Sequence, residues 1–218
     1  MLRIQGVELE ALFKKNKIIN MSVLSALTNP DALHSRSEIL TKPCPVPQER
    51  GLYAWYFKNI PPMVRIDGCI IKNGNTLLYA GISPKDEKST QNLRKRVTTH
   101  FRGNAEGSTL RLTLGTLLTG QSGFPLRRVG SGKQMTFTHL GEQWLDRWMD
   151  NNAFVCWIEH SAPWEVEKEL IQKTCLPLNI QDNSHHPFSS KLSELRTNAK
   201  LEARQQSIAF EDNQQRRM

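Results

Sequence analysis

The sequence predicts one α/β domain, and three observations support this prediction. The chain has 218 residues, of which 38% are hydrophobic, so it can bury one good core but not two full domains. Patterns typical of strands alternate along the chain with patterns typical of helices. No apolar run approaches a membrane span, and the first residues lack the apolar stretch of a signal peptide. We therefore expect a cytoplasmic protein with no membrane partner.

Three regions are predicted to form β-structure. Residues 51–57 are rich in aromatic side chains and are bounded by Gly51 on one side and Pro61-Pro62 on the other, which is typical of a strand. Asn73-Gly74 separates the apolar runs 69–72 and 76–80, and Asn-Gly supplies the positive φ angles that a tight hairpin requires. Residues 153–159 alternate well enough for a further strand. The sequence thus predicts a hairpin and two other strands.

Helical patterns occupy much of the remaining chain. Leu93, Val97 and Phe101 recur every fourth residue after possible capping hydroxyls at Ser89 and Thr90. Further helices are predicted at 7–17, 108–118, 144–149 and 163–175. We expect residues 1–48 to form a helical extension and residues 189–218 a helical or disordered tail.

The net charge of +8 is concentrated in one stretch of the chain. Between residues 91 and 133 there are eight basic residues and a single acidic one, Glu106. The basic residues are Arg94, Lys95, Arg96, Arg102, Arg111, Arg127, Arg128 and Lys133. A polyanion such as nucleic acid is one partner that this stretch would suit, and a solvated basic surface without a partner is the alternative.

Glu167 is the acidic residue whose position is most informative. On a helix that begins at Pro163, Glu167 lies on the same inward stripe as Trp164 and Ile171. An ionised carboxylate on an inward face is costly unless a cation or hydrogen-bond donors meet it. From the helix alone, both a metal ion and a salt bridge to an arginine remain open.

Six polar residues, taken in chain order, resemble the active site of the GIY-YIG nuclease superfamily. They are Tyr53 in Gly51-Leu52-Tyr53, Tyr79 in Tyr79-Ala80-Gly81, Arg96, His100 one helical turn later, Glu167, and Asn179 twelve residues after Glu167. The resemblance implies a small domain, which we place at 49–188, with a central, mainly antiparallel three-stranded sheet flanked by helices. The basic stretch at about 103–133 would then be an insertion around the site.

The resemblance also implies a role for each of the six residues. Tyr53 would act as a general base, Tyr79 would shape the site, Arg96 would hold the scissile phosphate, His100 would handle protons, Glu167 would bind Mg²⁺ or Mn²⁺, and Asn179 would orient neighbouring groups. The expected activity is metal-dependent endonucleolytic hydrolysis of DNA. The alternative is a catalytically weak or inactive nucleic-acid-binding or regulatory module with the same fold.

Nucleic-acid contacts outside the catalytic set are expected from the basic stretch. The residues proposed for them are Arg94, Lys95, Arg102, Arg111, Arg127, Arg128 and Lys133. Lys85 and Lys88, in the loop before Arg96, could contact phosphate, although loop lysines are usually only solvated. The sequence leaves the oligomeric state open.

Overall fold

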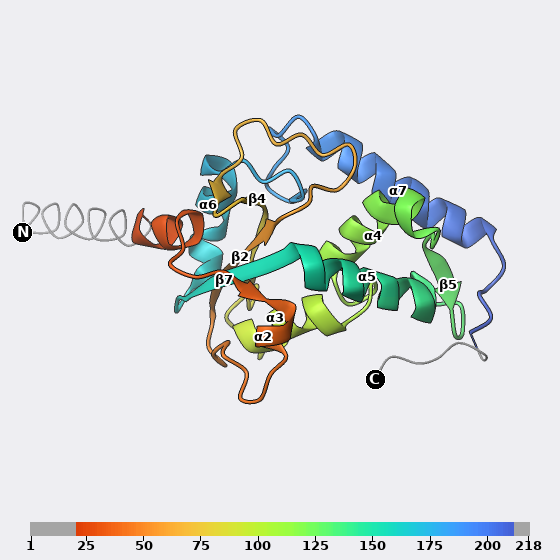
Figure 1. Cartoon of the computed structure of the whole chain (residues 1–218), viewed down its shortest axis with the longest axis horizontal. Helices are drawn as coiled ribbons and strands as arrows, with labels where there is room; N and C mark the ends of the chain where they lie inside the picture. The colour runs from red at the N-terminus through yellow and green to blue at the C-terminus, as the bar shows by residue number, and fades with distance from the viewer. Residues whose placement is uncertain (1–20, 212–218) are drawn as a thin grey trace, which may run out of the picture.

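The computed structural model of the protein describes residues 21–211, and an antiparallel sheet forms its centre (Figure 1). The strand order is β1-β7-β2-β4-β3. The strands are β1 (His34–Ser35), β2 (Gly51–Phe57), β3 (Ile71–Lys72), β4 (Asn75–Ser83) and β7 (Ala153–Glu159). Each strand runs antiparallel to its neighbours.

The expectation of a three-stranded sheet was wrong, because the sheet has five strands. Its long central strands, β7, β2 and β4, are the ones that the sequence patterns predict. The outer strands β1 and β3 contain only two residues each, which is too short for any periodicity to reveal. The hairpin prediction is confirmed, since Asn73 and Gly74 have φ angles of 51° and 73° between β3 and β4.

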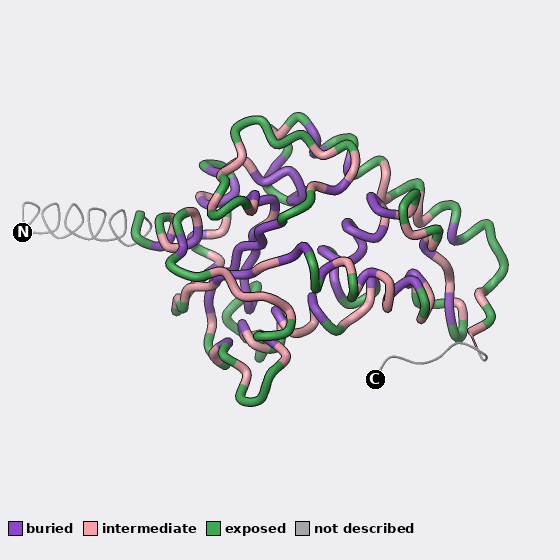
Figure 2. The backbone as a smooth tube through the Cα atoms, viewed as in Figure 1, coloured by how far each residue is buried: buried purple, intermediate pink, exposed green. Residues whose placement is uncertain are grey.

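Helices cover both faces of the sheet, and β2 is buried throughout (Figure 2). Alternate residues of β2, including Tyr53, face a core shared with α3 (Leu93–Arg102), α4 (Thr109–Ser122) and α5 (Thr138–Asn152). The other residues of β2 face α6 (Glu167–Lys173) and the helical residues 21–28. The sheet therefore has a helical layer on each side.

The helix starts and ends differ in detail from those that the sequence predicts. Helix α3 is capped by Asn92, whose Oδ1 accepts a hydrogen bond from the backbone N–H of Lys95 at 2.9 Å, and not by the hydroxyls predicted for this role. The predicted helix at 163–175 is divided into a 3-10 turn, η1 (Pro163–Glu165), and α6. Helix α6 ends before Thr174, which has an extended backbone.

The basic segment 103–133 is part of the main core. It contains α4 and β5 (Arg127–Val129), and β5 pairs with β6 (Gln134–Thr136) in a separate two-stranded sheet. Six of its leucines are buried in the same core as Tyr53 and Trp55, namely Leu110, Leu112, Leu114, Leu117, Leu118 and Leu126. The segment therefore contributes apolar side chains to the core as well as positive charge.

The last helix, α7 (Ser189–Gln205), packs along α4 and reaches β5 (Figure 1). Leu192 and Ala203 bury it against the main core. A short helix, α2 (Arg36–Ile39), follows β1. The helix predicted at 7–17 lies outside the described residues. Within residues 21–211, no helix combines the length and apolarity needed to cross a bilayer.

Candidate active site

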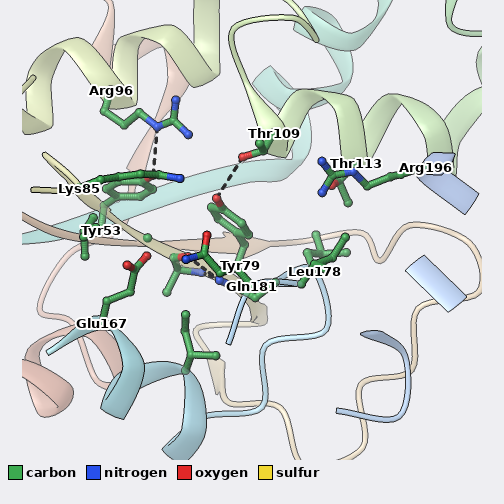
Figure 3. Close-up of a pocket in the computed structure, with 16 residues that line it drawn as sticks. Tyr53, Tyr79, Lys85, Arg96, Thr109, Thr113, Glu167, Leu178, Gln181 and Arg196 are labelled. Carbon is green, nitrogen blue, oxygen red and sulfur yellow. Dashed lines mark hydrogen bonds between the residues drawn. The ribbon is translucent and has the colours of Figure 1, made fainter. Parts of the chain in front are cut away.

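The six polar residues singled out from the sequence converge at one end of the central strands. Five of them line a cavity of about 290 Å³, while His100 lies behind Tyr53. Side chains reach this cavity from four directions, with Tyr53 and Tyr79 from the sheet, Arg96 from α3, Glu167 from α6 and Arg196 from α7 (Figure 3). The cavity therefore brings together residues separated by more than 140 positions in the chain.

Tyr53 is the centre of the hydrogen-bond network. Its hydroxyl oxygen lies 3.1 Å from Nε2 of His100 and accepts a bond from Nε of Arg96 at 3.3 Å. Nη1 of Arg96 also donates to the backbone carbonyl of Gly107 at 3.3 Å. Two of these bonds thus hold the Arg96 guanidinium at the cavity wall, where it can meet an anionic ligand.

His100 is fully buried, and both of its ring nitrogens have a hydrogen-bonding partner. Nδ1 lies 2.7 Å from Oγ of Ser108, which also accepts the backbone N–H of Arg111 at 3.1 Å as the N-cap of α4. If Ser108 donates its own proton to Nδ1, the remaining ring proton is on Nε2 and points at Tyr53. Burial, with Arg96 and Arg111 nearby, lowers the pKa of His100, so the ring is neutral at physiological pH.

The His100 tautomer determines how Tyr53 can act. In the tautomer with the proton on Nε2, the Tyr53 oxygen accepts from both His100 and Arg96, whereas in the other tautomer Tyr53 donates its own proton to Nε2. Burial raises the pKa of Tyr53 above its ordinary value of about 10, and the neighbouring Tyr79 raises it further, while Arg96 offsets part of the increase. Tyr53 is therefore a neutral phenol in the ligand-free protein, with the Arg96 guanidinium placed to stabilise a phenolate.

The glycines of the two tripeptides are required by close packing. A Cβ at Gly81 would lie 2.6 Å from the hydroxyl oxygen of Tyr53, its partner across β2 and β4. A Cβ at Gly51 would collide with the carbonyl oxygen of Ile158 on β7. Only glycine lets the neighbouring strands and the Tyr53 ring approach this closely.

Glu167 is the one carboxylate among the residues that line the cavity. It is half-buried, and its carboxylate forms no hydrogen bond or ion pair with any residue between 21 and 211. Burial, together with the nearby negative charge of Asp182, raises the pKa of Glu167, whereas the positive charges of Lys85 and Arg96 partly lower it. The salt bridge considered from the helix alone is therefore not formed here.

The donor set around Glu167 suits a hydrated magnesium ion better than a caged metal. No group of three potential ligands among His, Cys, Asp and Glu occurs in the described part of the chain. Mg²⁺ commonly keeps several waters and binds one or two carboxylates together with substrate phosphates. A lone, unpartnered carboxylate opposite Arg96 fits that type of site.

Asn179 fixes the strand that carries Tyr79. Its Oδ1 accepts the backbone N–H of Ala80 at 3.0 Å, and its Nδ2 donates to the Ala80 carbonyl at 2.8 Å. Both ends of the amide are thus used to hold β4 from outside the sheet. Tyr79, the neighbouring residue, places its hydroxyl 3.4 Å from Oγ1 of Thr109, as Figure 3 shows.

The basic residues predicted to bind nucleic acid have different environments. Arg111 is fully buried and bonds Glu142 and Asp146 at 2.7 Å and 2.9 Å, so the expectation that it faces a ligand needs correction. Arg127 and Arg128 donate to backbone carbonyls just after α7, and Arg94 donates to the carbonyl of Val46. Lys95, Arg102 and Lys133 are exposed.

Three further residues of this region lie at or next to the cavity. Lys85, which the sequence suggested as either a phosphate contact or a solvated lysine, lines the cavity. Arg196 also lines it, because α7 packs on α4 and turns this side chain inward. Ser108 holds His100, and its only sequence signal is that of a helix N-cap.

Comparison with known proteins gives one match. Residues 51–198 match the model of the GIY-YIG catalytic domain. Neither the curated proteins nor the solved structures contain a match to the chain. The matched segment includes all six polar residues and covers well over half of the sequence, and the chain belongs to the GIY-YIG family.

Proposed function

We propose that the protein is a divalent-metal-dependent endonuclease that hydrolyses phosphodiester bonds in DNA. The observation that carries this proposal is the placement of the unpartnered Glu167 carboxylate and the Arg96 guanidinium around the Tyr53 hydroxyl in one cavity. GIY-YIG nucleases generally depend on a divalent metal. DNA is proposed as the substrate from this family relationship and from the cationic residues at the cavity.

Each side chain has a distinct task in such a hydrolysis. Arg96 binds a non-bridging oxygen of the scissile phosphate, because its guanidinium stays charged and can bond two oxygens. Glu167 is the ligand for Mg²⁺ or Mn²⁺. A cation bound there would supply Lewis-acid stabilisation of the phosphate and of the departing 3′-oxygen.

Proton transfer is the task of Tyr53. Tyr53 first gives its phenolic proton to a solvent water. The phenolate then accepts a proton from the attacking water as the water oxygen bonds to phosphorus and the bond to the 3′-oxygen breaks, and the departing 3′-oxygen takes a proton from solvent. The N–H groups of His100 and Arg96 stabilise the negative oxygen meanwhile. His100 therefore acts through Tyr53, because it is buried behind that ring and does not line the cavity.

The test is cleavage of supercoiled plasmid by wild type and by Glu167→Gln, each with Mg²⁺ and with EDTA. The amide has nearly the same size but cannot supply the charge, so we expect cleavage to fall by at least about 10²-fold while DNA binding persists. Glu165→Gln is the matched control, since Glu165 is exposed two residues earlier. It should cleave like wild type.

Two outcomes would count against the proposal. A Glu167→Gln protein as active as wild type would remove Glu167 from the site. A wild type that binds DNA but does not cut it in Mg²⁺ or Mn²⁺ would instead favour the nucleic-acid-binding module.

A further inference from the structure

A second hollow, of about 270 Å³, adjoins the candidate active site. The two share Thr109 and Arg196 as lining residues, so Arg196 stands at the boundary between them. In Figure 3, Tyr79 lies between Tyr53 and Arg196. A ligand that leaves the Tyr53 side and passes Tyr79 would therefore reach Arg196 and then the second hollow.

Three cations of α7 follow one another along this hollow. Arg196, Lys200 and Arg204 all line it and are spaced by four residues, which places them on one side of the helix. Each interval of four residues advances about 6 Å along the axis. This is close to the separation of consecutive phosphates along one nucleic-acid strand. Lys133, from the turn between β5 and β6, also lines the hollow.

The protein itself does not neutralise these charges. Within residues 21–211, Arg196, Lys200, Arg204 and Lys133 form no ion pair. The single acidic lining residue is Glu106, whose Oε2 accepts the backbone N–H of Met135 at 2.9 Å.

Other cations of the fold do form ion pairs with carboxylates. On α7 itself, Lys191 pairs with Glu194 at 3.1 Å, and the buried Arg111 has two carboxylates. Four cations and one carboxylate share this hollow without forming an ion pair among the described residues, and the excess of positive charge indicates that an external polyanion completes the charge balance.

The position of α7 is fixed in advance of binding. Arg127 and Arg128 bond the carbonyls of Ser207 and Gln206 at 3.0 Å and 2.7 Å, and the backbone N–H of Ala209 bonds the Arg128 carbonyl. The β5–β6 hairpin thus holds the chain directly after α7. Helix α7 therefore does not have to become ordered when DNA binds, so little conformational entropy is lost on binding.

We propose that Arg196, Lys200 and Arg204 form a phosphate track that carries the substrate strand away from the scissile phosphate, with Lys133 on the facing wall. The floor of the hollow, which includes Leu112, Leu126 and Met135, gives the sugars and bases an apolar surface. This inference rests on the proposed nuclease function. It assigns to α7 a role in binding DNA phosphates, in addition to the single phosphate site around Arg96.

The experiment measures binding of a fluorescein-labelled DNA duplex by anisotropy at several salt concentrations. Every protein carries Glu167→Gln, so that the DNA stays intact. The test variant adds Lys200→Gln and Arg204→Gln, and the charge-matched control adds Arg147→Gln and Lys191→Gln, two exposed cations outside both hollows. Each lost phosphate contact should reduce the slope of log affinity against log salt by about 0.9, so the test variant should lose about 2 and the control nearly nothing.

Shortening the duplex on either side of the cut supplies a second readout. Truncation on the side that follows α7 should weaken DNA binding by the parent protein. It should not weaken binding by the Lys200→Gln, Arg204→Gln variant, because that variant has already lost the contact. Equal slopes for test variant and control, with parent binding intact, would overturn the track alone. Failure of the parent protein to bind DNA at any length would overturn the proposed function itself.

Discussion

The hydroxyl oxygen of Tyr53 lies 3.1 Å from Nε2 of His100, and both residues are almost completely inaccessible to solvent. His100 in turn bonds Ser108 at 2.7 Å, at the first turn of α4. The ring is therefore fixed between a helix cap and the proposed base. We therefore expect its effect on Tyr53 to depend on which ring nitrogen carries the proton.

Ser108→Ala is expected to lower kcat by about 10- to 100-fold, the usual cost of removing a group that orients a functional side chain. The reason is that His100 can then adopt the tautomer whose Nε2 does not donate to Tyr53. KM should change little, because Ser108 does not line the cavity. Steady-state cleavage of a short labelled duplex would measure both parameters.

The control for that variant is Ser35→Ala, which removes the capping serine of α2. Loss of a helix cap costs about 1 kcal/mol of stability in either case. If both variants lose the same stability and the same activity, the effect of Ser108 is only structural.

Gly81→Ala should reduce cleavage strongly, since the added methyl group would lie 2.6 Å from the Tyr53 hydroxyl. We expect destabilisation of about 1–3 kcal/mol as the ring is displaced. Gly120→Ala is the comparison, because its Cβ meets nothing within 4 Å on an exposed turn of α4. It should leave activity intact and stabilise the helix by up to about 1 kcal/mol. Activity and urea unfolding of the two proteins test this, and a fully active Gly81→Ala enzyme would contradict it.

Lys85→Ala should move the acidic limb of the pH–activity profile to higher pH. Burial already raises the pKa of Glu167, and Lys85 is the largest influence that lowers it. A metal-binding carboxylate must be ionised, so activity falls as the pH drops through its pKa, and a still higher pKa moves that fall upward. Lys88→Ala, in the same exposed loop but outside the cavity, should leave the midpoint unchanged. Profiles of kcat/KM at subsaturating Mg²⁺ would reveal a shift, and coincident midpoints would exclude the electrostatic coupling.

Arg111→Ala should destabilise the protein by about 3–5 kcal/mol, because it leaves Glu142 buried without its partner. Arg147→Ala, on the exposed side of α5, should change the free energy of unfolding by less than about 0.5 kcal/mol. Urea titration measures both effects. Where Arg111→Ala remains folded, the salt dependence of DNA binding should equal that of wild type, and a smaller slope would restore Arg111 to the nucleic-acid contacts.

The sequence predicts the parts of this protein that depend on local patterns. The bounds of β2 and β7 and the turn at Asn73-Gly74 follow from residue types that act within a few positions. The order of the polar motifs was enough to suggest the family that the comparison shows. Two-residue edge strands carry no such pattern, which is why the sheet was expected to be narrower.

The errors and omissions come from contacts between distant segments. In the sequence, Arg111 cannot be distinguished from the other cations of the basic stretch. Its partners Glu142 and Asp146 follow 31 and 35 residues later, so no local pattern reveals them. The spacing of Arg196, Lys200 and Arg204 is visible in the sequence, but only the packing of α7 on α4 determines which side that row faces.

Glu142 joins the basic segment to the centre of the molecule, since its Oε1 also accepts the backbone N–H groups of Ala105 and Phe137. The loop that it holds leads to Gly107 and Ser108, which bond Arg96 and His100. A chimera that exchanged residues 103–133 with a relative would therefore replace supports of the proposed base together with any target preference. We therefore expect that exchanging this whole segment would impair the proposed cleavage, and that new target preferences would have to come from substitutions made one side chain at a time.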